Sequence, residues 1–300
     1  MGARPLRIVL ATVLATTTIA FSPIVPRATA SPDGTGLVIS QIYGGGGNVG
    51  ASFTHDFIEI FNPTANPISL NGKSVQYASS TGTGLFGSTD NVITVLPNVQ
   101  LGAGQYFLIQ EATGGGIATP LPTPDLTDAV PINMAAGAGK VALVNSTTTL
   151  GCNGSSTACS AAQSALIIDL VGYGLFTNFF EGSPTQNIDA TSSVSRNGAG
   201  CTDTNNNFGD FTVITPPAPR NTATAVHSCA TNELAISDVS LAEGDTGTTE
   251  FSFDVTLSSP AGVGGVTFDI GTADGTAVAP GDFAAQSLTG QNIPEGATTY

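Results

Sequence analysis

The sequence has few basic residues, and this scarcity limits what it can bind. Only 7 of its 300 residues are Lys or Arg, against 22 Asp or Glu. Three of the seven lie within the first 30 residues, which we expect to be removed, so the remaining chain has a formal charge of 4 − 22 = −18. This charge repels phosphate backbones, so direct nucleic-acid binding is not expected, whereas divalent cations and basic surfaces are favoured partners.

After its first 30 residues the sequence lacks an apolar run long enough to span a membrane. Within those 30, two arginines precede an uncharged, mostly apolar run from Ile8 to Val25, and the small residues Ala28–Ala30 follow. This order predicts a secretory signal peptide at residues 1–30, cleaved before Ser31. A membrane anchor is the alternative, but threonines and prolines interrupt a run that is already short. We therefore expect a secreted or cell-surface protein with no transmembrane span after cleavage.

Histidine and cysteine are too sparse, and too widely spaced, to favour a zinc site. The two histidines are His55 and His227, and there is no close Cys-x-x-Cys pair. The four cysteines are Cys152, Cys159, Cys201 and Cys229. An even number of cysteines in an exported chain indicates disulfides, with three possible pairings. We favour the first with the second and the third with the fourth, because each of these pairs brackets a loop-like stretch.

The sequence also lacks a long stretch with helical periodicity, whereas short apolar and β-branched runs recur throughout it. Turn formers separate these runs, and the chain has 37 Gly and 18 Pro. The pattern predicts an all-β fold, most simply a sandwich of antiparallel sheets. The predicted strands are Leu37–Tyr43, Phe57–Phe61, Gln105–Gln110, Lys140–Asn145, Leu166–Tyr173 and Phe211–Ile214.

A second domain is predicted from about residue 230. Pro216–Pro219 cannot continue a strand pairing, and a polar stretch of small residues, Thr222–Thr231, follows. Apolar alternation then resumes at Leu234 and recurs in Glu250–Leu257 and Val263–Ile270, as expected of half-buried strands. The predicted division is 31–229 and 230–300.

The first domain resembles the bacterial, secreted form of the lamin-tail domain. The resemblance rests on six stretches in the family's order: VISQIYGGGGN (Val38–Asn48), HDFIEIFNPTANPISLNG (His55–Gly72), GKVALVN (Gly139–Asn145), DLVGYG (Asp169–Gly174), DTNNNFGDF (Asp203–Phe211) and PAPRN (Pro217–Asn221). It covers roughly residues 36–229 and implies an immunoglobulin-like β-sandwich.

The second domain looks like a Calx-β domain, a calcium-binding module of sodium/calcium exchangers that recurs in adhesive extracellular proteins. The matching stretches are DVSLAEGDTG (Asp238–Gly247), FSFDVTLSSP and TADGTAVAPGDF (Thr272–Phe283). The family's last strands and final acidic cluster should follow GQNIPEGATTY, so we expect a Calx-β sandwich truncated at its C-terminus.

By this resemblance, Glu243 and Asp274 fall on calcium-ligand positions. Carboxylates that converge on loops suit Ca²⁺, which takes six to eight oxygen ligands. Two carboxylates are too few, however, and the alternative is that both acids only form turns. Asp282 is favoured as a structural turn residue rather than a ligand.

A second hypothetical calcium loop lies at residues 203–210, DTNNNFGD, where Asp203, Asn205 and Asn207 alternate. The sixth position is Phe208 rather than Gly, and Ile214 stands where an EF-hand has its Glu, so an EF-hand is excluded. The alternative is an Asn-rich turn whose side chains bond to their own backbone.

The sequence contains fragments of catalytic motifs but no complete one. The stretches GDFT (Gly209–Thr212) and GDFA (Gly281–Ala284) imitate part of the GDFN motif of endonuclease/exonuclease/phosphatase enzymes, but the asparagine is lacking and no acid–histidine pair follows. His55 and Asp56 are adjacent on a strand and should point to opposite faces. We predict no catalytic residue in this segment.

The resulting expectation is a non-catalytic extracellular binding or display segment supported by Ca²⁺. Its partner would be an extracellular protein or glycan. The alternative is an N-terminal accessory region of a secreted nuclease of the endonuclease/exonuclease/phosphatase family, whose catalytic domain lies beyond residue 300.

Overall fold

The computed structural model describes residues 36–89, 92–229, 233–242, 244, 246–261 and 265–300. The chain separates into two compact units at Ala230. We call described residues 36–229 the first unit and described residues 233–300 the second unit. The predicted signal peptide and Glu243 lie outside the described residues.

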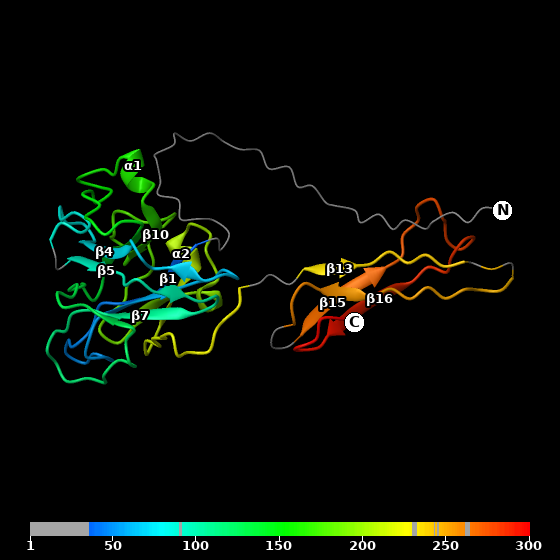
Figure 1. The fold of residues 1–300 in the computed structure, drawn as a ribbon, viewed down its shortest axis with the longest axis horizontal. Helices are drawn as coiled ribbons and strands as arrows, with labels where there is room; N and C mark the ends of the chain where they lie inside the picture. Colours follow the sequence, from blue (N-terminus) through cyan, green and yellow to red (C-terminus); the bar gives the residue numbers. More distant parts are fainter. Residues whose placement is uncertain (1–35, 90–91, 230–232, 243, 245, 262–264) are drawn as a thin grey trace. The chain divides into compact units, whose positions relative to one another are not determined.

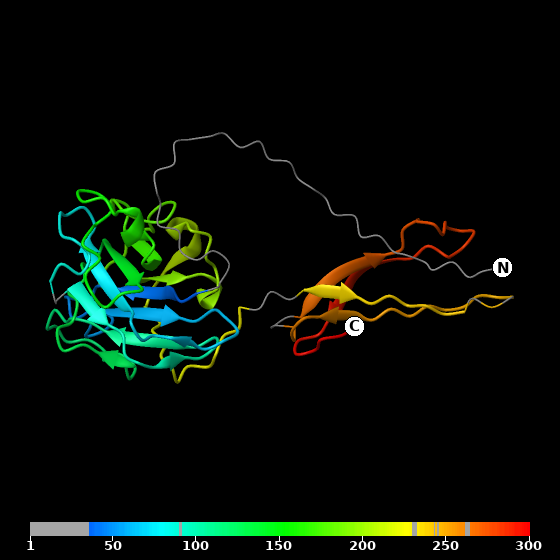
Figure 2. The same cartoon turned by 45° about the horizontal axis from the view of Figure 1, so that its top comes forward.

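Two sheets of mainly antiparallel strands form the first unit (Figures 1 and 2). The larger sheet has the order β12-β11-β1-β2-β7-β8, with β12 Phe211–Ile214, β11 Ser193–Arg196, β1 Val38–Tyr43, β2 Phe57–Phe61, β7 Tyr106–Gln110 and β8 Leu126–Thr127. The smaller has the order β10-β9-β4-β5, with β10 Ile167–Tyr173, β9 Gly139–Val144, β4 Ser74–Ser79 and β5 Ile93–Val95. A short pair, β3 (Ile68–Ser69) and β6 (Gln100–Leu101), stands apart from both. The predicted all-β sandwich is confirmed.

The core of the first unit lies between the two sheets. Ile58 and Ile60 of β2 and Val141 and Leu143 of β9 belong to one buried cluster, and each is fully inaccessible to solvent. Each buried aliphatic side chain of this kind contributes about 1.5–3 kcal/mol. The strong apolar content of these strands explains why their positions follow from the sequence.

Strands β4 and β11 were not predicted, because polar residues fill them. Strand β4 has the sequence SVQYAS and β11 has SVSR. Most of their polar side chains are nevertheless buried. Gln76 Nε2 donates to Thr148 O at 2.9 Å, and Ser193 Oγ donates to Gln41 Oε1 at 2.9 Å. Such partners come from distant parts of the chain and leave no periodic signal.

The second unit contains two two-stranded sheets, β13 (Leu234–Ile236) with β14 (Val255–Leu257), and β15 (Val266–Gly271) with β16 (Ser287–Ile293). Val255, Leu257, Ala261 and Ile293 form its small buried core.

The described helices all lie in the first unit and are one turn long, namely α1 (Ala161–Ser164), the 3₁₀ turn η2 (Gly198–Gly200) and α2 (Asn207–Asp210). No helix within the described residues could cross a membrane.

Candidate functional site

A buried ion-pair network around Arg196 joins the two sheets of the first unit. Arg196 is the last residue of β11, and Asp169 lies in β10 of the opposite sheet. Their Nη2 and Oδ2 atoms are 2.7 Å apart, and both side chains are completely buried. A hydrogen bond between a guanidinium and a carboxylate is about twice as strong as one between neutral groups.

Irregularities in two strands make room for this network. The β1–β2 register shifts between Ile39 and Gln41, and the β10–β9 register shifts between Ile167 and Asp169. Such bulges free backbone groups from the ladder and re-aim side chains. Here Asp169 Oδ2 accepts a hydrogen bond from the Ile39 N–H at 2.6 Å, and Arg196 Nε donates to the Ile39 carbonyl at 2.9 Å.

Two further carboxylates lie beside Arg196: Asp203 from the loop that follows η2, and Asp210 from the end of α2. Arg196 Nη1 is 3.2 Å from Asp203 Oδ1 and 4.0 Å from Asp210 Oδ2. Burial raises the pKa of Asp169, and the charge of Asp203 adds to the rise while Arg196 opposes it. Burial alone lowers the pKa of Arg196, but Asp169 and Asp203 outweigh it and hold the pKa above its usual range.

The hypothetical calcium loop at 203–210 lies in this network. Two of its predicted ligands, Asp203 and Asn205, lie together, and the third, Asn207, does not join them. Asp203 and Asn205 are in contact, because the Asn205 N–H donates to Asp203 Oδ1 at 3.4 Å. Asn207 is turned away and fully buried. Its Oδ1 accepts from the Gly172 and Glu181 N–H groups, and its Nδ2 donates to Leu170 O. Asn207 thus ties the loop to β10 and has no carbonyl lone pair left for an ion.

Asp210 organises the same loop from its other end. Its Oδ2 accepts from the backbone N–H groups of Thr204 (2.9 Å) and Asn206 (3.1 Å), and its Oδ1 accepts from Thr204 Oγ1 at 2.7 Å. A carboxylate that accepts from two nearby backbone N–H groups in this way holds a turn. The turn-forming alternative therefore describes Asp210 and also the bond from the Asn205 N–H to Asp203 Oδ1, whereas Asn207 bonds to segments outside the loop. Ion binding by Asp203 and Asn205 stays a prediction.

In the second unit, the acidic stretch around Asp274 forms turns. Asp274 is exposed, and its Oδ1 accepts from the Ala279 N–H at 2.9 Å. Asp282 Oδ2 accepts from the Val278 N–H at 2.8 Å, which agrees with a structural role. No cluster of three or more His, Cys, Asp or Glu side chains suited to a metal occurs among the described residues. Calcium binding at Glu243 and Asp274 stays a prediction. Of these two residues the structure describes Asp274 alone, and a single carboxylate does not form a calcium site.

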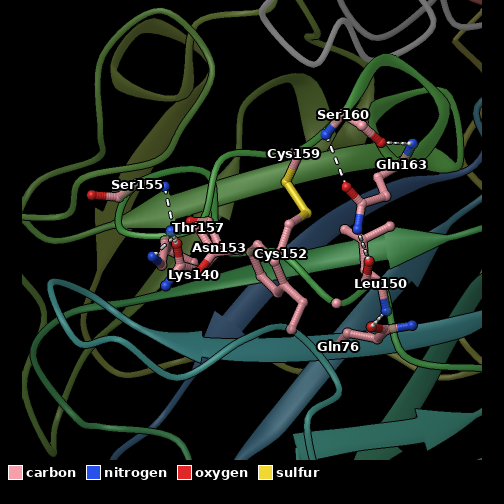
Figure 3. The surroundings of a disulfide bond; sticks show 12 residues. Gln76, Lys140, Leu150, Cys152, Asn153, Ser155, Thr157, Cys159, Ser160 and Gln163 are labelled. Atoms are coloured by element: carbon pink, nitrogen blue, oxygen red, sulfur yellow. Dashed lines mark hydrogen bonds between the residues drawn. A yellow bond between two sulfur atoms is a disulfide. The ribbon is translucent and has the colours of Figure 1, made fainter.

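The two predicted disulfides are both present. Cys152–Cys159 closes a seven-residue separation, and Cys201–Cys229 closes one of 28. Figure 3 shows the first of them beside Lys140, whose Nζ donates to Asn153 O at 3.0 Å and to Asn178 Oδ1 at 2.9 Å. Burial lowers the pKa of Lys140 to about 8.

Two other buried carboxylates escaped the sequence analysis as functional candidates. Asp56 accepts from the Gly46 and Met134 N–H groups, and Glu111 accepts from the Ile132 N–H and from Thr94 Oγ1. Burial raises the pKa of Asp56 to about 7 and that of Glu111 to about 8. Because both Asp56 oxygens accept from backbone groups, Asp56 does not form a dyad with His55, whose Nδ1 lies against Thr54 Oγ1.

A second ion pair of the first unit joins Arg220, in the PAPRN stretch, to Glu59 of β2. Arg220 Nη2 contacts Glu59 Oε1 of β2 at 2.7 Å, and the guanidinium lies 3.8 Å from the centre of the Tyr106 ring. Glu59 is fully buried and Arg220 is 20% exposed. Burial raises the pKa of Glu59, and the charge of Arg220 opposes the rise. This ion pair holds the PAPRN stretch against β2 of the larger sheet.

Residues 30–174 match the Lamin Tail Domain family. The lamin-tail part of the predicted resemblance is confirmed over this range, which includes β1 to β10. Lamin-tail domains are immunoglobulin-like and non-catalytic. No curated protein sequence matches the chain.

Proposed function

We propose that this chain is an exported, non-catalytic binding and display segment that Ca²⁺ supports. The observation that carries the proposal is the placement of charge. Four lysines and arginines lie in the described part of the chain. Lys140 and Arg196 are completely buried, and Arg220 is paired with Glu59. Of these four, Lys73, which is half-buried, is therefore the cation left to offset the exposed carboxylates. Residues 230–300 contain ten Asp or Glu and no Lys, Arg or His.

The consequence is an excess of carboxylates over cations among the accessible charged groups, which is greatest in the second unit, because several carboxylates of the first unit are themselves buried. Such an excess attracts divalent cations and basic partner surfaces and repels phosphate backbones. The proposed partner is therefore an extracellular protein or glycan with cationic groups. In the second unit, whose stretches resemble a Calx-β domain, Ca²⁺ would relieve the mutual repulsion of the turn carboxylates.

Export and display are tested by locating the chain in the organism that produces it. Antibodies against the chain should label the outside of intact cells or detect it in the medium, with residues 1–30 removed. A variant lacking residues 2–30 is the control and should stay inside the cell. Exclusive recovery of the wild-type chain from inside the cell would refute export.

The non-catalytic assignment needs a separate assay. The purified chain should leave plasmid DNA intact in the presence of Mg²⁺, Mn²⁺ or Ca²⁺. Cleavage that co-purifies with the chain would contradict the assignment and favour the nuclease-related alternative. A co-purifying form larger than 30.0 kDa that cleaves DNA, while the 30.0-kDa chain does not, would support the accessory-region alternative.

A further inference from the structure

Three side-chain oxygens in the Arg196 network are buried without a hydrogen-bond partner in the described part of the chain. They are Asp169 Oδ1, Asp203 Oδ2 and Asn205 Oδ1. The side chain of Asp169 is 0% exposed and that of Asp203 is 3% exposed. Buried polar atoms in native proteins nearly always have a partner, and an orphaned one calls for a bound ion or water.

The orphaned oxygens belong to a region with excess negative charge. Arg196 interacts with Asp169, Asp203 and Asp210 in direct ion pairs, and the charge of Glu181 also acts on it. Four carboxylates against one guanidinium give 1 − 4 = −3 formal charges. Uncompensated charge in a protein interior is costly unless a counter-charge reaches it.

The guanidinium satisfies one oxygen of each of two carboxylates and leaves the other. It contacts Asp169 through Oδ2 and Asp203 through Oδ1, so the unpartnered atoms are Asp169 Oδ1 and Asp203 Oδ2. Asp210 does not share this feature, because both of its oxygens accept hydrogen bonds from the loop. The orphaned oxygens are thus particular atoms on two carboxylates and one amide, rather than a general excess of acid.

We propose that Asp169 Oδ1, Asp203 Oδ2 and Asn205 Oδ1 bind a calcium ion beside Arg196. Two carboxylate oxygens and one amide oxygen are the hard donors that Ca²⁺ prefers, and its flexible coordination suits ligands from a strand and a loop. Mg²⁺ fits less well, because it demands near-ideal octahedral geometry and keeps its waters. The ion lowers the local charge from −3 to −1 and clamps the 203–206 loop to β10.

This site is separate from the calcium proposed for the second unit. It differs from the loop suggested by the sequence, because Asp169 of β10 replaces Asn207. It does not depend on export or on the identity of a partner, although it supplies a reason for the calcium support proposed above. The experiment therefore uses variants in each unit.

The test is thermal unfolding of the oxidised full chain, followed by circular dichroism, in EGTA and in CaCl₂. At a calcium concentration about 100 times Kd, the first unit should unfold about 5–10 °C higher than in EGTA. Asp203→Asn and Asp169→Asn should remove this calcium-induced rise. Asp128→Asn is the matched control, because Asp128 is a half-buried acid of the same unit, outside the Arg196 network, that accepts from the Val130 N–H, and it should keep the full rise.

Calcium binding measured by equilibrium dialysis guards against a variant that merely unfolds. The wild-type chain should bind one calcium ion more than Asp203→Asn, and Asp274→Asn should retain that ion. An unchanged calcium-induced rise in Asp203→Asn overturns the inference, as does a wild-type chain that calcium does not stabilise, which would assign the orphaned oxygens to water. A rise abolished only by Asp274→Asn also overturns it, while leaving the proposed function intact. An equal rise with MgCl₂ overturns the choice of calcium.

Discussion

The Arg196 network makes a quantitative prediction for the stability of the first unit. Arg196→Met keeps much of the side-chain volume but removes the guanidinium, and with it the pair to Asp169 and the hydrogen bonds to Ile39 O and Thr202 O. Removing one partner of a buried ion pair costs about 3–5 kcal/mol, because the other charge is left uncompensated. Because whole domains are stable by about 5–15 kcal/mol, the variant should lose a large share of its free energy of unfolding.

A double-mutant cycle separates this cost from lost packing. Asp169→Asn removes the charge that Arg196→Met strands, so the double variant should be less destabilised than the sum of the two single variants by about 0.5–3 kcal/mol. The assay is urea unfolding in EGTA, followed by circular dichroism, so that calcium does not contribute. Additive single effects, or a loss below about 1 kcal/mol for Arg196→Met, would refute the view that the network holds the two sheets together.

Three other predictions follow from buried groups. Because the folded-state pKa values of Asp56 (about 7) and Glu111 (about 8) lie above the ordinary 3.8 and 4.5, the folded state binds more protons, and the free energy of unfolding should fall between about pH 4 and pH 8. Glu111→Gln should flatten that fall in urea titrations across this range, and an unchanged slope would contradict the assignment. Cys201→Ser should lower the free energy of unfolding by about 3.5 kcal/mol and Cys152→Ser by about 2.5 kcal/mol, because the first disulfide closes a 28-residue separation and the second a seven-residue one. The reverse order in denaturant unfolding would argue against loop entropy. Gly46→Ala should cost at least about 1–3 kcal/mol, because its Cβ would lie 2.0 Å from the Asp56 nitrogen, and near-wild-type stability would show that the loop yields.

The sequence predicted the strands whose side chains are strongly apolar. Leu37–Tyr43, Phe57–Phe61 and Leu166–Tyr173 match β1, β2 and β10 to within one residue. Strands β4 and β11 were missed because serine and glutamine occupy positions that tertiary hydrogen bonds satisfy. In the second unit, alternation over Glu250–Leu257 predicted a longer strand than β14, Val255–Leu257.

The candidate site was predicted only in part, for a physical reason. Asp203 and Asn205 stood out because their spacing is local, and both lie at the network. Asp169 and Arg196 did not, since they are 27 positions apart and meet only because two sheets pack face to face. Asn207 was included by spacing, but a buried amide takes the hydrogen bonds that its surroundings offer, and here those are backbone groups of β10 and of the loop at Glu181.

Composition and local pattern by themselves determined the all-β class, the scarcity of basic charge and the even set of cysteines whose favoured pairing the structure contains. These properties depend on residue types and on neighbours along the chain. Tertiary structure alone decided which carboxylates are buried, which of their oxygens have partners and where the few cations lie. The free energy of a charge depends on its distance to other charges and on its exposure to water, and both are set by the packing of segments as far apart as Ile39 and Asp169.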